Sequence, residues 1–433
     1  MHEYALRVRW GVGLLAAIGA CVIVAFATSS SSQAAPTAST AASATSSCGP
    51  KPGVAAKGKP ITLGAINTKQ PGTDFTDIEN MEGAYFACVN ANGGVNGHPI
   101  KLIKLTEPTQ PAQIAADAKQ LVADHVLGIS GTSSILECTI NYKFWEKMQY
   151  KVIAAGIAPE CYGTPNYADV NMGPRYSSDG AVQYVLGLHP SKIVFDQSNV
   201  PGTGYIAAGP NALAKHAHTA ITDLTENVPI TDANSVALKE VQDAGQNGAV
   251  VLNFTPPEAL LILQAAQKLN IEGKVKAWAC STPCDTDFLA KSLGPQWNGK
   301  LFVNAELTPP DVTNTPTMKL YKAILSQYGK DVSGGIGSFS QMGFTMGKIA
   351  TYALNTIKGA YTKKSVNAAF EAVKNFNTGM LCQPWTYGPY KLHIANNADY
   401  TVTPKNGKMV TKQGCTDISS VDPQIAAYRK AIK

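Results

Sequence analysis

Short apolar runs alternate with longer amphipathic segments from residue 61 onward, and this pattern predicts strands and helices in turn. A first set predicts strands at 61–66, 100–105, 126–130 and 151–155 and helices at 76–92, 112–124 and 134–148. A second set predicts strands at 192–196, 219–224, 249–253, 274–279 and 300–305 and helices at 179–188, 205–216, 234–247 and 257–269. Helices at 316–328, 339–357 and 365–375 and a β-rich stretch at 384–410 follow. Such alternation favours an α/β fold with two doubly wound parallel sheets.

A Gly-rich turn separates the first predicted helix from the second strand. It reads Asn-Ala-Asn-Gly-Gly-Val-Asn-Gly-His-Pro at residues 90–99. Gly and Asn tolerate the positive φ that such a turn requires, and Pro99 ends the helix. In this position, between the predicted helix and the strand that follows it, the turn resembles that of the type I periplasmic binding proteins of the branched-chain amino acid ABC transporter family. The resemblance covers about residues 59–430.

This resemblance implies two lobes that close around a ligand and are joined by three hinge crossovers. By analogy, the N-terminal lobe comprises residues 59–176 and 307–386, and the C-terminal lobe comprises residues 177–306 and 387–433. The crossovers are expected near 174–179, 306–310 and 385–389. Gly, Pro and small polar residues in these stretches suit the φ/ψ changes of a hinge.

The composition is that of an ordinary globular protein with a weakly charged surface. The chain has 433 residues, of which 45% are hydrophobic, so it can form two or three domains with real cores. Charged residues make up 15% and the net charge is +6. No Lys/Arg-rich run with interleaved aromatic residues is present, so we expect no nucleic-acid partner.

The first 34 residues have the features of a secretory signal. Arg7 and Arg9 precede an apolar run at 11–27, so we expect export to the periplasm or to the outer face of the cytoplasmic membrane. Two processing routes remain open: cleavage before Ala35, or lipidation of Cys21 in a lipobox-like Ile-Gly-Ala-Cys. Residues 35–58 begin with a Ser/Thr/Ala/Pro tract and are predicted to be a flexible linker.

Eight cysteines lie beyond the signal segment, and an even number in an exported protein indicates disulfides. Cys280 and Cys284 lack a second Cys/His pair nearby, which argues against a metal site. If the chain has the fold that the resemblance implies, chain order favours four bridges: Cys48–Cys88, Cys138–Cys161, Cys280–Cys284 and Cys382–Cys415.

Ligands of open parallel sheets lie at the carboxyl ends of the strands, which directs attention to the loops there. In the related binders, the loops after the third and fourth strands hold the carboxylate and amino groups of the ligand. Carried over, the candidates are Thr132, Ser133, Ser134, Gly156 and Ala158, although Ser134 also suits a helix cap. The other loops add Gln70, Thr73, Phe75, Tyr205, Phe254 and Ser281, with Tyr205 and Phe254 as aromatic lids or as core residues.

The chain departs from the family pattern where an amino acid ligand would need a carboxylate for its ammonium group. Asp74, Glu160, Glu226 and Asp285 are the only candidates, and none has supporting context. A small or aromatic carboxylic acid therefore suits the sequence as well as leucine does.

We therefore expect an extracytoplasmic substrate-binding protein that delivers a small solute to an ABC transporter permease. It should be a monomer without a cofactor. A ligand-binding sensor of the same fold is the alternative. An enzyme ranks last, because no Gly-x-Ser-x-Gly, His-Glu-x-x-His or Gly-x-x-x-x-Gly-Lys-Ser/Thr motif is present.

Overall fold

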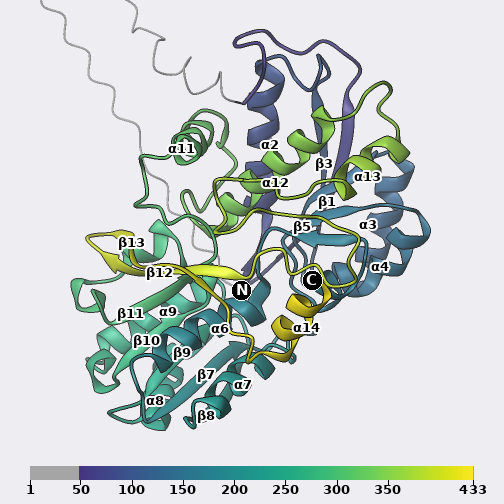
Figure 1. Cartoon of the computed structure of the whole chain (residues 1–433). Helices are drawn as coiled ribbons and strands as arrows, with labels where there is room; N and C mark the ends of the chain where they lie inside the picture. Colours follow the sequence, from purple (N-terminus) through teal and green to yellow (C-terminus); the bar gives the residue numbers. More distant parts are fainter. Residues whose placement is uncertain (1–47, 433) are drawn as a thin grey trace, which may run out of the picture. The chain divides into compact units, whose positions relative to one another are not determined.

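The computed structural model describes residues 48–432 (Figure 1). The expected signal segment, Cys21 and most of the expected linker lie outside these residues. The first sheet contains β1 (Ile61–Gln70), β2 (Thr73–Asp74), β3 (Ile100–Glu107), β4 (Gly128–Thr132), β5 (Val152–Ala154) and β6 (Tyr167–Asp169). Strand β1 pairs in parallel with β3 and β4, β5 and β6 continue the parallel sheet, and β2 folds back antiparallel on β1.

The second sheet has the order β13-β12-β11-β10-β9-β7-β8. Its strands are β7 (Lys192–Ser198), β8 (Ala220–Glu226), β9 (Ala249–Asn253), β10 (Ala277–Cys280), β11 (Leu301–Ala305), β12 (Ala398–Lys405) and β13 (Lys408–Asp417). Strands β7 to β11 are parallel, and β12 and β13 are antiparallel additions at one edge. The two sheets with flanking helices confirm the predicted fold class.

Helices from both ends of the chain cover the first sheet. They are α2 (Thr76–Ala91), α3 (Pro111–Ala123), α4 (Glu137–Lys147), α5 (Glu160–Gly163), α11 (Pro316–Tyr328), α12 (Ser338–Asn355) and α13 (Lys363–Glu371). The second sheet is flanked by α6 (Gly173–Leu186), α7 (Ala208–His216), α8 (Ala233–Ala244), α9 (Pro256–Lys268) and α10 (Asp287–Ser292). We call each sheet with its helices the first lobe and the second lobe.

Two glycines allow close packing between α2 and α12 in the first lobe. A Cβ on Gly343 would lie 2.0 Å from the carbonyl oxygen of Ile78, and a Cβ on Gly347 would lie 3.0 Å from the ring of Tyr85. The spacing of four residues places both glycines on the same face of α12, toward α2. Larger residues there would push the two helices apart.

Several sequence predictions were wrong in detail. The predicted helices at 134–148 and 205–216 begin later, at Glu137 and Ala208. Strand β6, helix α5 and the C-terminal helix α14 (Pro423–Ala431) were not predicted. Residues 384–397, predicted as β-rich, contain no named strand. They run across the first sheet. Polar contacts with residues distant in the sequence hold them there, and strand pairing does not.

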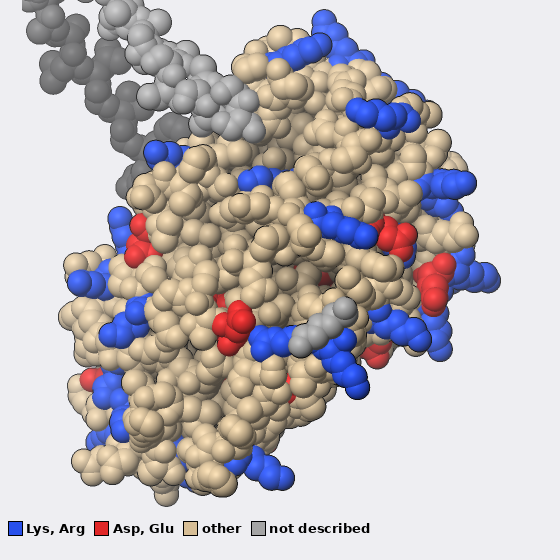
Figure 2. Space-filling view, in the orientation of Figure 1, with Lys and Arg blue, Asp and Glu red and all other residues tan. Residues whose placement is uncertain are grey.

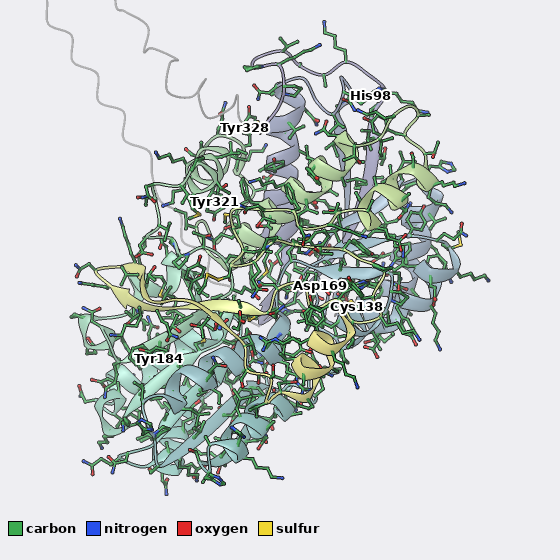
Figure 3. The ribbon with its side chains drawn as sticks, viewed as in Figure 1. His98, Cys138, Asp169, Tyr184, Tyr321 and Tyr328 are labelled. Carbon is green, nitrogen blue, oxygen red and sulfur yellow. A yellow bond between two sulfur atoms is a disulfide. The ribbon has the colours of Figure 1, made fainter. Side chains whose placement is uncertain are left out.

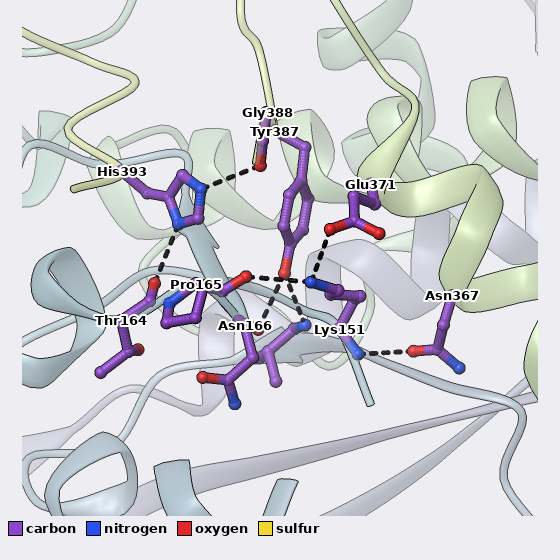
Figure 4. A network of polar contacts seen from close by, with 10 residues as sticks. Lys151, Thr164, Pro165, Asn166, Asn367, Glu371, Tyr387, Gly388 and His393 are labelled. Carbon is purple, nitrogen blue, oxygen red and sulfur yellow. Dashed lines mark hydrogen bonds and ion pairs between the residues drawn. The ribbon is translucent and has the colours of Figure 1, made fainter. Parts of the chain in front are cut away.

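Figure 4 shows these contacts around Tyr387. The Tyr387 hydroxyl donates to the Asn166 carbonyl at 2.8 Å and accepts from the Val152 N–H at 3.1 Å. Nearby, the Lys151 ammonium lies 2.7 Å from the Glu371 carboxylate. The ring nitrogens of His393 each lie 3.0 Å from a carbonyl oxygen, those of Thr164 and Gly388. Residues 385–389, expected as the third crossover, therefore still belong to the packing of the first sheet.

The chain passes between the lobes after β6, after β11 and before β12. One side chain joins all three passages, because the Asn396 amide donates to the carbonyl oxygens of Val170 at 3.3 Å and Glu306 at 3.0 Å. The N–H of Met172 in turn donates to Oε2 of Glu306 at 2.6 Å. Residues 174–179, expected as the first crossover, lie within α6. The lobe boundaries given above remain predictions.

The structure contains all four expected disulfides, which join Cys48 to Cys88, Cys138 to Cys161, Cys280 to Cys284, and Cys382 to Cys415. The first two lie in the first lobe and the third stiffens the loop after β10. The fourth ties the segment before β12 to β13.

Candidate functional site

A cavity of about 90 Å³ lies where the strand ends of the two lobes face each other. Many of its lining residues lie at the ends of β2, β4, β5 and β6 of the first lobe and of β7, β9, β10 and β11 of the second, or within three residues after them. We call it the inner cavity. Asp169 at the end of β6, labelled in Figure 3, marks the zone where the lobes meet. This is the position in which parallel α/β sheets bind their ligands.

Most of the inner cavity wall is apolar. Phe75 and Phe339 meet edge to face with ring centroids 5.4 Å apart. The remaining apolar side chains of the wall include Ile78, Ile135, Ile157, Val200, Ile206, Phe254 and Met342. Such a wall favours a ligand with an apolar body.

A few uncharged polar groups face this apolar wall. The hydroxyls of Thr73, Ser133 and Ser198 have no hydrogen-bond partner among the described residues. In Asn253, Oδ1 accepts from the Ser281 hydroxyl at 2.7 Å, which leaves the amide N–H₂ to donate. These groups can orient a polar end of a ligand without a formal charge.

Glu306 is the one ionisable side chain among the residues 48–432 that line the inner cavity. Its Oε2 accepts from Met172, and its Oε1 has no partner among the described residues. Burial raises the pKa of Glu306 to about 8, and the nearby carboxyls of Asp285 and Asp399 act in the same direction. At neutral pH the group is mostly protonated and can donate a hydrogen bond into the cavity.

Four of the candidates named from sequence line the inner cavity, namely Thr73, Phe75, Ser133 and Phe254. Gln70 lines a neighbouring cavity instead. Thr132, Ser134, Gly156, Ala158, Tyr205 and Ser281 do not line the inner cavity, although Ile157 and Thr282 beside them do.

The structure shows what these other candidates do. Thr132 accepts from the Ile66 N–H at 3.2 Å, and Ser134 accepts at 3.2 Å from the N–H of Glu137, the first residue of α4, although the N-cap position itself is Leu136. Gly156 lies against Asp169, where a Cβ would come within 2.5 Å of Oδ1. They support the loops that form the cavity.

Tyr205 and Ser281 also act beside the cavity. The Tyr205 hydroxyl donates to the carbonyl oxygen of Ile157 and so links the two lobes. Ser281 holds Asn253, which lines the cavity. None of the four carboxylates considered for a ligand ammonium, Asp74, Glu160, Glu226 and Asp285, lines the inner cavity. Glu306 lines the cavity and is absent from the candidates drawn from sequence, where residues 306–310 are expected as a hinge, although it directly follows the buried strand β11.

A sequence model of the periplasmic binding protein family matches residues 60–408. The chain belongs to the type I periplasmic binding proteins. Members of this family are substrate-binding proteins of transporters rather than enzymes, and they lie outside the cytoplasm. No curated protein sequence matched this binding protein.

Solved structures with the same fold share little sequence with this binding protein. A branched-chain amino acid ABC transporter protein from Thermus thermophilus with bound valine has a TM-score of 0.73 at 15% identity, over 86% of this chain and 100% of its own. A fatty acid ABC transporter substrate-binding protein from Thermomonospora curvata has a TM-score of 0.69 at 16% identity, over 87% of this chain and 97% of its own. A solute-binding protein from R. palustris in complex with benzoate has a TM-score of 0.64 at 16% identity, over 82% of this chain and 96% of its own.

Two further observations bear on partners. Within the described part of the chain, no helix is long and apolar enough to cross a membrane, and no cluster of His, Cys, Asp or Glu could hold a metal ion. Lys and Arg side chains are scattered over the face that Figure 2 shows, without a continuous basic patch.

Proposed function

We propose that this binding protein is the substrate-binding component of an ABC importer and captures a small carboxylate-bearing solute between its two lobes. The observation that carries the proposal is the inner cavity, which combines an apolar wall, neutral donors and the protonated Glu306. The solute would be an amino acid or a small apolar or aromatic acid. The ligands of the three proteins with the same fold, valine, fatty acid and benzoate, are all of this kind.

Contacts across the cleft support capture by closure. The Thr255 hydroxyl of the second lobe donates to the Gly72 carbonyl of the first at 2.9 Å, and Tyr205 links to Ile157 in the same way. A ligand that touches both lobes favours the closed state by its differential affinity for that state. The closed monomer would then dock on a membrane permease and release the solute.

The Ser133 hydroxyl provides the first test. Replacing Ser133 by alanine should weaken binding of the solute by about 1–3 kcal/mol, because a buried carboxylate loses a hydrogen-bond donor. Isothermal titration calorimetry would measure the change. Ser326→Ala, at an exposed position on α11, is the matched control and should bind as the wild type does. Equal affinity in all three proteins would remove Ser133 from the site.

The pH dependence of binding tests the role of Glu306. A simple acid needs Glu306 protonated, so its affinity should fall as the pH rises through about 8, by up to about tenfold per pH unit above it. Glu306→Gln should abolish this dependence while keeping a donor. An amino acid whose ammonium group contacts Glu306 would behave in the opposite way, since its affinity should rise as the pH approaches about 8 and Glu306→Gln should abolish that rise. A pH-independent affinity in the wild type would contradict both roles.

A further inference from the structure

A second cavity of about 380 Å³ adjoins the inner cavity between the lobes, and we call it the outer cavity. Its first-lobe wall is formed by residues 70–77 and by residues 333–340 at the start of α12. The start of α9 and Phe288 of α10 form the wall from the second lobe. It is several times larger than the inner cavity, and nothing in the family assignment gives it a role.

Only a thin partition separates the two cavities. Thr73, Thr255 and Phe339 line both of them. Phe339 is half-buried and packs edge to face on Phe75, and Thr255 is held by its hydrogen bond to Gly72. The Phe339 ring and the two threonine side chains therefore form the shared boundary of the two cavities.

The wall of the outer cavity is suited to an apolar group. Pro256, Pro257, Phe288 and Phe339 present carbon surface, and Phe288 is 44% exposed although it is a large aromatic residue. An exposed aromatic side chain at such a cavity is a candidate contact for an apolar group of a ligand.

The charged side chains that line the outer cavity disfavour an anion. Asp74, Asp77 and Glu258 line it, and no Lys or Arg does so within residues 48–432. Each carboxylate already has a partner: Asp74 lies 3.1 Å from the Lys69 ammonium, Asp77 accepts from the Gly334 N–H at 2.6 Å, and Glu258 accepts from the Ile230 N–H at 2.7 Å. A ligand group entering there meets negative charge and no free counter-charge.

We infer that the solute is an elongated monocarboxylate, whose acid end lies in the inner cavity and whose uncharged apolar tail passes Phe339 into the outer cavity. This inference rests on the proposed function and adds the shape and charge of the substrate. It distinguishes the solute from a compact amino acid, which the inner cavity alone would hold.

The test uses straight-chain acids from butanoate to decanoate, with calorimetry on the wild-type chain. Affinity should rise about fourfold per added methylene group once the tail reaches the outer cavity. Decanedioate should bind at least tenfold more weakly than decanoate, because its second carboxylate meets the acidic wall. Equal affinities for hexanoate and decanoate, or for decanoate and decanedioate, would overturn the inference and leave the proposed function standing. Absence of binding by every straight-chain acid would also overturn the inference, and the proposed function would fall only if branched-chain amino acids and benzoate failed to bind as well.

Variants locate the tail. Pro257→Trp, at an exposed position in the first turn of α9, should fill the outer cavity and weaken decanoate binding at least tenfold, with butanoate binding unchanged. Leu261→Trp, one turn further along α9 and 41% exposed, is the matched control and should change neither affinity. Phe288→Ala, which removes carbon surface without adding bulk, should weaken decanoate binding several-fold. Unchanged decanoate binding in Pro257→Trp and Phe288→Ala would overturn the inference.

Discussion

Replacing Arg175 by methionine should lower the free energy of unfolding by about 3–5 kcal/mol at pH 7, the largest effect that we expect from one substitution. Nε of Arg175 on α6 lies 2.7 Å from Oδ2 of Asp422, which caps α14, and the two residues are 5% and 0% exposed. Burial and the adjacent Asp422 raise the pKa of Asp179 well above its usual range, so the charge of Arg175 balances that of Asp422. Methionine keeps the carbon volume and leaves one buried carboxylate without a counter-charge.

A second variant separates this electrostatic effect from a packing defect. The double variant Arg175→Met/Asp422→Asn removes both charges and retains a helix cap, so it should recover more than half of the loss. Urea unfolding measured by circular dichroism would follow all three proteins. A deficit below about 1 kcal/mol in Arg175→Met, or no recovery in the double variant, would show that the ion pair is not the cause.

Gly343→Ala should destabilise the first lobe by about 2–3 kcal/mol, the second largest effect that we expect. The added Cβ would lie 2.0 Å from the Ile78 carbonyl oxygen and 3.0 Å from the Glu82 nitrogen, both of them backbone atoms of α2. Backbone cannot rotate away as a side chain can, so α2 and α12 must separate. This cost exceeds the gain of about 1 kcal/mol that alanine brings to a helix.

Gly83→Ala is the matched control, because Gly83 lies in the middle of α2 and an added Cβ would meet no atom within 4 Å. It should therefore stabilise the protein by about 0.5–1 kcal/mol. Thermal unfolding of both variants would show Tm shifts of opposite sign. Shifts of the same sign would mean that helix propensity, and not the contact between α2 and α12, decides the effect.

The long elements of the fold could be predicted because each one carries its own pattern. Strands such as β9 are continuous apolar runs, and α12 is a longer, largely apolar segment that is buried over most of its surface. Strand β6 has only three residues, too few to show a local period, and its pairing with β5 alone defines it. Helix α14 did leave a signal, since Asp422 followed by Pro423 is a strong helix start, and it was missed.

The candidate site was harder to predict than the fold. Loops that follow strands identified Ser133 and Phe254, because strand order alone fixes which end of a sheet they occupy. Which residue of a loop faces the cavity depends on tertiary packing, so Ile157 lines it and its neighbours Gly156 and Ala158 do not. Phe339 of α12 also lines the cavity. The sequence around it could not predict this, because α12 reaches the cavity only by packing against elements that are distant in the sequence.

Thermal unfolding with a panel of small solutes tests the central claim most directly, namely that the inner cavity binds a carboxylate-bearing solute. The panel would hold branched-chain amino acids, straight-chain acids and small aromatic acids, with the corresponding primary amides as controls that lack the carboxylate. We expect one class of acid to raise Tm in a concentration-dependent way, with a smaller rise in Ser133→Ala. At acid concentrations of 100 to 1,000 times Kd, the free energy of unfolding should increase by about 3–4 kcal/mol. No shift with any acid, or equal shifts in the wild type and Ser133→Ala together with equal shifts from the amides, would contradict the claim.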